Sequence, residues 1–178
     1  VLTNDYEFYK KIKKLKAFGI DKDIKDRKKQ GDYDVKSLGF NYRMTDFQAA
    51  LGLNQIVKYT INLRQRHTIA KRYIKNFMNN KKIKHMPYSK NCSFFIFQIF
   101  CKNRDKILKE LKNKKIGVSV HYSNALPKMT YYKKKYNLNI DKFKNADSYG
   151  CTNISLPVYP KLKMIEVDKI CKTIIGLI

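Results

Sequence analysis

The chain has 178 residues, 43% of them hydrophobic, which excludes a disordered polymer and allows one or two packed domains. Its formal net charge of +25 is typical of nucleic-acid-binding proteins, but only six of the 39 basic residues are arginine, and lysine is spread along the whole chain. The charge therefore predicts non-specific attraction to anions rather than a dedicated nucleic-acid surface.

The cysteines show neither a CxxC pair nor a metal-ligand spacing with histidine, and we expect buried free thiols of a reducing cytoplasm at Cys92, Cys101, Cys151 and Cys171. No metal site is expected. No apolar run approaches the ~18 residues that a membrane span needs, so we also expect no membrane segment and a cytoplasmic location.

The chain begins with Val1-Leu2-Thr3, which is typical of the end of a β-strand and carries no initiator methionine. This start predicts a fragment of a longer protein. A helix is expected next, capped by Asn4 or Asp5, with apolar residues at i, i+4 and i+7 (Phe8, Ile12 and Leu15). Gly19 is expected to end this segment.

Residues 20–40 are charged and rich in turn residues, and predict a long loop of the kind that often carries function. The stretch LGFNYRMTDFQAALG follows at residues 38–52. Within it, Thr45 and Gln48 have the spacing of a capping box, which predicts a helix running to about Met78. Gly52 inside this helix is expected to mark a close packing contact.

The remainder of the chain, from a proline- and lysine-containing linker at 79–91 onward, has an α+β pattern. In chain order we expect a buried strand at 93–100, a helix capped by Asn103, an alternating strand at 117–122, a loop with a short helical piece at 124–136, a helix at 143–151, a strand at 154–157, and a last helix carrying Val167, Ile170, Cys171 and Ile174.

The stretch LGFNYRMTDFQAALG resembles the signature of the pyridoxal-phosphate-dependent nucleotide-sugar aminotransferases, the DegT/DnrJ/StrS family. The resemblance continues along nearly the whole chain. Val1–Asn4 is similar to the strand after the family's cofactor lysine. Two segments resemble the 4-amino-sugar branch, Lys16–Asp21 and Tyr33–Val35. Three further segments resemble the small domain: Val120–Tyr122, Leu126-Pro127 and Ser155–Pro157.

The resemblance implies roles for four residues. Asn41 matches the asparagine that reaches across the dimer to the phosphate of the partner subunit's pyridoxal 5'-phosphate. Arg43 would lie near the active site and order the loop or meet substrate phosphate. His121 and Tyr122 stand where the family places substrate-contacting residues. From the residues alone, Asn41 and Arg43 are a loop asparagine and a salt-bridged residue of a capping region, and His121 and Tyr122 could be packing residues.

The family's Schiff-base lysine, the acidic partner of the pyridine nitrogen and the group stacked on the ring all precede the segment that Val1–Asn4 matches, so no catalytic residue is assigned in this chain. The resemblance implies an α/β fold, the C-terminal part of a fold-type I aminotransferase. We expect residues 1–79 to be the end of the cofactor-binding large domain with a long interdomain helix, and residues 80–178 to be a small α+β domain.

The implied activity is transamination of a keto-sugar nucleotide, of the 4-keto-6-deoxy type, with glutamate as amino donor, by a homodimer with shared active sites that serves amino-sugar and surface polysaccharide synthesis. The fragment alone is expected to be inactive. Three alternatives stay open: a sugar dehydratase of the same family, in which histidine replaces the lysine; a basic nucleic-acid-binding protein; and a non-catalytic partner subunit.

Overall fold

The computed structural model describes all 178 residues, which separate into two compact units, Val1–Val57 and Lys58–Ile178. The long helix α2, Asp46–Phe77, begins in the first unit and ends in the second. The expected boundary, with the end of a large domain at residues 1–79 and a small domain at 80–178, refers to the fold of the full-length protein and stays a prediction.

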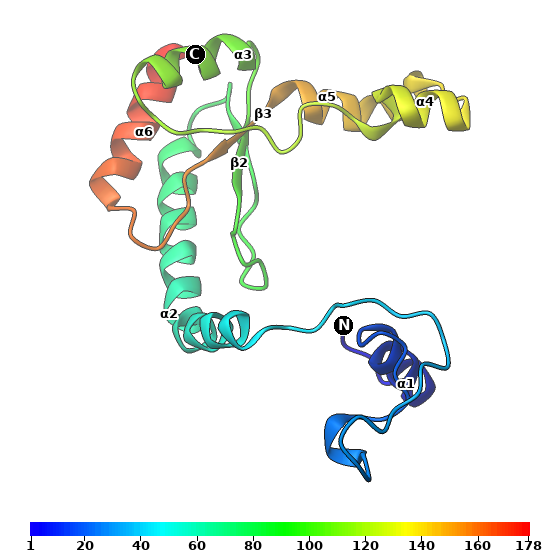
Figure 1. Cartoon of the computed structure of the whole chain (residues 1–178). Helices are drawn as coiled ribbons and strands as arrows, with labels where there is room; N and C mark the ends of the chain where they lie inside the picture. Colours follow the sequence, from blue (N-terminus) through cyan, green and yellow to red (C-terminus); the bar gives the residue numbers. More distant parts are fainter. The chain divides into compact units, whose positions relative to one another are not determined.

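The first unit contains helix α1, Tyr6–Leu15, the short 3-10 helix η1, Ile24–Asp26, and the start of α2 (Figure 1). Asp5 caps α1 by accepting a hydrogen bond from the backbone N–H of Phe8 at 2.9 Å, as expected. The loop between α1 and α2 folds back on the end of α1 through backbone hydrogen bonds. These bonds, rather than a buried core, define the first unit.

The start of α2 has the predicted capping box. The backbone N–H of Gln48 donates to Thr45 Oγ1 at 3.2 Å, and the backbone N–H of Thr45 donates to Gln48 Oε1 at 3.0 Å. The two bonds satisfy backbone donors that a helix start leaves without intrahelical partners. The close contact expected at Gly52 is wrong within this chain, since nothing lies within 4 Å of a Cβ placed there.

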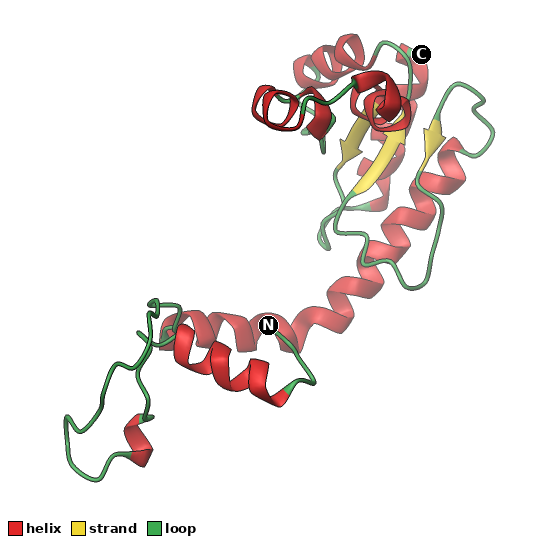
Figure 2. Cartoon of the chain, turned by 90° about the vertical axis from the view of Figure 1, so that its right-hand side faces the viewer, coloured by secondary structure: helices red, strands yellow, loops and turns green.

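The second unit is built on a three-stranded antiparallel sheet in the order β1-β2-β3, with β1 at Lys84–His85, β2 at Phe97–Phe100 and β3 at Asn153–Leu156 (Figure 2). Its helices and 3-10 helices are α3, Arg104–Asn113; η2, Leu126–Lys128; α4, Thr130–Tyr136; η3, Ile140–Phe143; α5, Lys144–Thr152; and α6, Met164–Leu177. In Figure 1, α5 and α4 follow one another away from the sheet.

The core of the second unit joins α2, α3, α6 and the sheet. Tyr73 and Phe77 on α2 are fully buried, and the Tyr73 ring stacks on the Phe97 ring at 5.0 Å between centroids. The predicted apolar face of α6 is confirmed, because all four of its expected residues are buried. The Tyr73 hydroxyl donates to the Pro157 carbonyl at 2.9 Å, so its burial leaves no polar atom unpaired.

An ion pair fixes α6 against α2. Arg72 binds both carboxylate oxygens of Asp168, through Nε at 2.7 Å and Nη2 at 2.6 Å, and Asn76 Nδ2 donates to the same carboxylate at 2.8 Å. Hydrogen bonds from Arg72 and Asn76 lower the pKa of Asp168 to about 2. The forked geometry of arginine favours this two-point contact.

Several sequence predictions are wrong in detail. Only Phe97–Phe100 of the strand expected at 93–100 is extended, because Phe94 takes a left-handed conformation, with φ of 45°. Asn103 precedes α3 but does not cap it, since its own φ of 54° is left-handed, whereas a capping residue is extended. All four cysteines are free thiols, but only Cys101 and Cys171 are buried, whereas Cys92 is half-buried and Cys151 is exposed.

The alternating strand expected at 117–122 is reduced to a single bridge between Ser119 and Ser155. The short strand β1 was not expected, since it falls inside the proposed linker. The helix at 143–151, the strand at 154–157 and the helical piece within 124–136 are confirmed as α5, β3 and α4. No helix combines the length and the apolar character that crossing a membrane requires.

Candidate functional site

The segment that carries Asn41 and Arg43 is fixed against the end of α1 by backbone hydrogen bonds. The N–H of Phe40 donates to the Leu15 carbonyl at 2.7 Å, and the N–H of Tyr42 donates to the Lys16 carbonyl at 2.9 Å. An antiparallel bridge pairs Ala17 with Asn41. The backbone of Asn41 is therefore held in place while its side chain is exposed.

Two glycines allow this close approach. A Cβ on Gly39 would lie 1.9 Å from the backbone nitrogen of Gly19, a distance that no side chain tolerates. Gly19 itself has φ of 73°, which favours glycine, and a Cβ there would lie 1.8 Å from the Ser37 carbonyl oxygen. The two glycines thus set the position of the segment that follows them.

Arg43 pairs with no carboxylate, so the salt bridge that a merely structural role would give it is absent from the structure. Instead its guanidinium lies over the Phe18 ring, with Cζ 5.3 Å from the ring centroid. A cation held against an aromatic face keeps its hydrogen-bond donors at the edge of the guanidinium plane. Arg43 is therefore oriented and still able to bind an anion.

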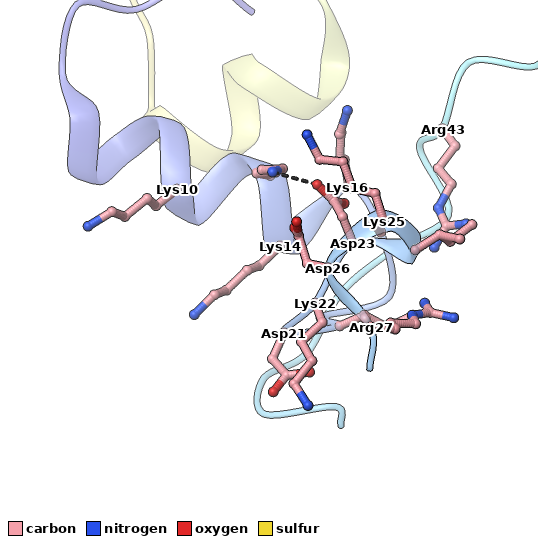
Figure 3. Close-up of a pocket in the computed structure, with 14 residues that line it drawn as sticks. Lys10, Lys14, Lys16, Asp21, Lys22, Asp23, Lys25, Asp26, Arg27 and Arg43 are labelled. Atoms are coloured by element: carbon pink, nitrogen blue, oxygen red, sulfur yellow. Dashed lines mark ion pairs between the residues drawn. The ribbon is translucent and has the colours of Figure 1, made fainter. Parts of the chain in front are cut away.

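Arg43 also lines an open pocket of about 660 Å³ in the first unit (Figure 3). Eight of the lining residues are basic and three are acidic: Lys10, Lys13, Lys14, Lys16, Lys22, Lys25, Arg27 and Arg43 against Asp21, Asp23 and Asp26. This excess of positive charge favours an anionic ligand. Sequence reasoning missed the pocket because lysines occur throughout the chain and their spacing gives no signal.

Five of the pocket's side chains already form ion pairs: Lys10 with Glu7, Lys13 with Asp23, Lys22 with Asp32, and Asp21 with Lys36. Lys13 Nζ lies 2.5 Å from Asp23 Oδ2, and this contact, dashed in Figure 3, raises the pKa of Lys13 and lowers that of Asp23. Arg27, by contrast, has a buried Nε without a hydrogen-bond partner, and its guanidinium lies over the Tyr33 ring at 4.5 Å. Arg27 is thus a further cation of the pocket with an unused donor.

His121 and Tyr122 lie in the second unit, after the Ser119 bridge. His121 Nδ1 is 2.9 Å from Ser155 Oγ and 3.2 Å from Ser119 Oγ, while the Tyr122 side chain is 71% exposed. The two rings meet edge to face at 5.4 Å. His121 is therefore neither a free surface residue nor a core residue, since one of its ring nitrogens is held and the ring is only partly buried.

Two buried amides, Gln98 and Asn153, contact the backbone of His121, and sequence reasoning missed both. The signal was present for Gln98, a single amide inside the apolar run Phe94–Phe100. Asn41 and Arg43 thus lie on one segment of the first unit, and the rings of His121 and Tyr122 meet in the second.

The residues present fit one end of pyridoxal phosphate. An exposed asparagine amide and an arginine are suitable donors for a phosphate dianion. An aldimine-forming lysine is instead activated by a lowered pKa, and the lysines with a clear shift, Lys10, Lys13 and Lys128, all have pKa values raised by neighbouring carboxylates. The donors of Asn41 and Arg43 therefore fit the phosphate of the cofactor.

The chain matches the DegT/DnrJ/EryC1/StrS aminotransferase family over residues 1–175. It is 31% identical to UDP-4-amino-4,6-dideoxy-N-acetyl-beta-L-altrosamine transaminase of Campylobacter jejuni, an alignment that covers 100% of this chain and 47% of that protein. The chain thus spans about half the length of the curated relatives it matches.

This chain also spans slightly less than half the length of similar solved structures. Helicobacter pylori PseC, an aminotransferase involved in the biosynthesis of pseudoaminic acid, superposes with a TM-score of 0.87 at 27% identity, over 98% of this chain and 47% of PseC. The PLP form of Spr1654 from Streptococcus pneumoniae, described as a sugar aminotransferase, superposes with a TM-score of 0.82 at 27% identity, over 97% of this chain and 43% of that one.

Proposed function

Because this chain belongs to the DegT/DnrJ/EryC1/StrS aminotransferase family, we propose that it is the C-terminal portion of a pyridoxal-phosphate-dependent transaminase of nucleotide sugars. The observation that carries the proposal is the anchored segment with Asn41 and Arg43 at the edge of a basic pocket. The relation to a Campylobacter transaminase and to PseC supports a sugar-nucleotide substrate.

Asn41 binds the phosphate of the cofactor, and it does so in the partner subunit of a homodimer with shared active sites. Pyridoxal phosphate, when bound, supplies the electron-accepting ring on which an amino group is exchanged. The backbone bridge between Ala17 and Asn41 fixes the position of the Asn41 backbone, and the exposed side-chain amide extends from this anchored point. The Schiff-base lysine comes from the half of the protein that precedes this chain.

Arg43 and the basic pocket receive the diphosphate of the sugar nucleotide. A diphosphate carries negative charge on several oxygens, and five of the pocket's eight basic residues form no ion pair: Lys14, Lys16, Lys25, Arg27 and Arg43. The guanidinium groups of Arg27 and Arg43, stacked on Tyr33 and Phe18, provide oriented hydrogen bonds, while the lysines contribute mainly charge. Stacking on Phe18, unlike a salt bridge to a carboxylate, leaves the hydrogen-bond donors of Arg43 free for the diphosphate.

His121 and Tyr122 contact the sugar. His121 offers its remaining ring nitrogen, since Nδ1 is held by Ser155 and Ser119, and the exposed Tyr122 offers both an aromatic face and a hydroxyl. Glutamate is the amino donor, and the acceptor is a keto-sugar nucleotide of the 4-keto-6-deoxy type. The enzyme works in the cytoplasm and provides amino sugars for surface polysaccharides.

The test uses the full-length enzyme, in which this chain is joined to the half that precedes it. The enzyme is supplied with pyridoxal phosphate, ¹⁵N-glutamate and a UDP-4-keto-6-deoxy sugar, and the product is examined by mass spectrometry. We expect a ¹⁵N-amino sugar nucleotide and 2-oxoglutarate. A dehydrated sugar without nitrogen would instead indicate a dehydratase of the same family, and an unchanged sugar with no 2-oxoglutarate would contradict the proposal.

The role of Arg43 is tested in the same assay. Arg43→Ala is expected to raise the KM for the sugar nucleotide by roughly tenfold or more, because a hydrogen bond to a charged group contributes about 1.5–3 kcal/mol. Arg64→Ala, an exposed arginine of α2 outside the pocket, is the matched control. Equal KM values for the two variants would remove Arg43 from substrate binding.

A further inference from the structure

The backbone at His121 and Tyr122 is held by side chains rather than by a strand. The pairing with β3 ends at the Ser119–Ser155 bridge, so the peptide groups beyond it need other partners. Part-buried backbone groups without a strand partner are satisfied by water or by side chains. Here the partners are two primary amides from the core.

Asn153, at the start of β3, is the first of them and is 0% exposed. Its Oδ1 accepts a hydrogen bond from the backbone N–H of His121 at 3.1 Å, and its Nδ2 donates to the Tyr122 carbonyl at 3.1 Å. The same Nδ2 donates to the carbonyl of Tyr149 at 2.8 Å. One buried side chain therefore ties the His121–Tyr122 peptide to the end of α5 and to β3.

Gln98, in the middle of β2, is the second and is 6% exposed. Its Nε2 donates to the His121 carbonyl at 2.7 Å, and its Oε1 accepts a hydrogen bond from the Tyr149 hydroxyl. Gln98 and Asn153 together bind both polar groups of the His121 backbone. We call Gln98 and Asn153 the amide clamp.

Placing two amides in an apolar core is costly unless every polar atom is paired, and an apolar pair of similar size would avoid that requirement. Both side-chain amides of the clamp have hydrogen-bond partners for their nitrogen and oxygen atoms. The segment that they hold is one exposed turn. The clamp stabilises a segment in which the Tyr122 side chain is largely exposed. This favours a role in positioning over a role in folding.

The clamp also determines which ring nitrogen of His121 is available. With the backbone fixed, Nδ1 lies between the Ser155 and Ser119 hydroxyls at 2.9 and 3.2 Å. A histidine held at one nitrogen presents the other in a defined direction. Nε2 is thus the atom that a ligand can reach.

We propose that Gln98, Asn153 and Ser155 are positioning residues that hold His121 so that Nε2 meets the sugar of the nucleotide-sugar substrate. This inference rests on the proposed function, because it takes its substrate from there. The clamp itself is a property of this chain and can be measured without substrate or cofactor.

The first test is hydrogen exchange of the His121 backbone amide in the 178-residue chain, followed by NMR. Asn153→Ala removes the acceptor of that amide and is expected to speed its exchange roughly tenfold, in line with the loss of one hydrogen bond. Asn113→Ala, an exposed asparagine at the end of α3, is the matched control and should leave the rate unchanged. Equal rates in both variants would overturn the clamp.

Ser155→Ala is the second variant, for use also where Asn153→Ala does not fold. It removes only a hydroxyl, and the backbone bridge between Ser155 and Ser119 remains possible. We expect the ¹⁵N chemical shifts of the His121 ring to change, because Nδ1 loses a partner, whereas Ser148→Ala should leave them unchanged. Unchanged shifts in Ser155→Ala would overturn the positioning of the ring.

The last test uses the full-length enzyme and separates the two half-reactions. Ser155→Ala should raise the KM for the keto-sugar nucleotide several-fold with a smaller change in kcat, and Ser155→Thr should restore it. The glutamate half-reaction, followed by cofactor absorbance, should be unchanged. An unchanged sugar KM would overturn the inference. A wild-type enzyme with no glutamate half-reaction would instead overturn the proposed function and the substrate role with it, and the exchange data would still decide the clamp.

Discussion

The two units of this chain reach their structures by different means. In Lys58–Ile178, a continuous core buries aromatic and aliphatic side chains from three helices and the sheet. In Val1–Val57, the only buried residue is Gly19, and apolar side chains such as Phe8, Phe40 and Phe47 are exposed. Backbone hydrogen bonds and close glycine contacts define the first unit, while apolar packing defines the second. An apolar pattern in the sequence therefore predicts a helix face but not whether that face is covered.

Helix α2 contains both situations in one element. Phe77 near its end is 0% exposed and stacks on Tyr73, whereas Phe47 near its start is 74% exposed. The two phenylalanines have the same chemistry and the same secondary structure. The difference between them isolates the contribution of burial.

The largest expected effect comes from this pair. Phe77→Ala should lower the free energy of unfolding of the second unit by about 3–5 kcal/mol, because it leaves a cavity in a packed core. Phe47→Ala in the same chain should change it by less than about 0.5 kcal/mol. Urea unfolding followed by near-ultraviolet circular dichroism measures both. Similar losses of unfolding free energy for the two variants would show that Phe47 is packed in a core of the first unit, against its exposure in the structure.

A smaller effect is expected in the first unit from Gly39→Ala. The new Cβ would meet the Gly19 backbone at 1.9 Å, so the segment with Asn41 must move away from α1. Overpacking of this kind typically costs about 1–3 kcal/mol. Amide exchange at Phe40 and Tyr42 should accelerate, since their hydrogen bonds to Leu15 and Lys16 are lost.

The exchange rates of the second unit are the internal control for Gly39→Ala. The amides of β2 and α6 should exchange as in the wild type, because the clash lies within Val1–Val57. Acceleration in both units would contradict the separation into independent parts.

The pH dependence of the second unit should come from Asp168. Its folded pKa of about 2 is below the ordinary value of 3.8, so the stabilisation is fully present above pH 3.8 and is lost as the pH falls toward about 2. Asp168→Asn should remove this part of the acid sensitivity. Thermal unfolding at a series of pH values measures it, and identical acid profiles for the wild type and the variant would show that the Arg72 pair does not contribute.

The smallest effect is expected at Gly52, in the exposed part of α2. A Cβ there meets no atom within 4 Å, so Gly52→Ala should stabilise the helix by up to about 1 kcal/mol through propensity alone. Amide exchange in residues 46–57 should slow accordingly. Faster amide exchange in that segment would indicate that the added methyl group meets a neighbour, although no atom lies within 4 Å in the structure.

Local signals in the sequence predicted the helices well. The Thr45–Gln48 capping box, the Asp5 cap and the apolar face of α6 each depend on residues close in sequence, and each is present. The errors arise where distant residues decide. The apolar run before β2 was expected to be one strand, but Phe94 turns into the core beside Tyr88 and Phe97. Pairing of residues 117–122 ends after Ser119 because side-chain amides replace it.

The candidate site was predictable only where its residues are close in sequence. Asn41 and Arg43 stand in a short motif, and the resemblance points to them directly. The basic pocket could not be found among 33 lysines, although seven of its eight basic residues lie within residues 10–27, because a lysine-rich stretch is usually a solvated surface. Gln98 and Asn153 are 55 residues apart, and nothing in the sequence indicates that both bind the backbone of His121.

The most direct test of the central claim is the dissociation constant of pyridoxal phosphate in the full-length enzyme, measured by absorbance titration for the wild type and for Asn41→Ala. Loss of one hydrogen bond to a phosphate corresponds to about 1.5–3 kcal/mol, so we predict an affinity at least roughly tenfold weaker, with Asn113→Ala equal to the wild type. Equal affinity in Asn41→Ala and the wild type would contradict the assignment of the anchored segment to the cofactor site.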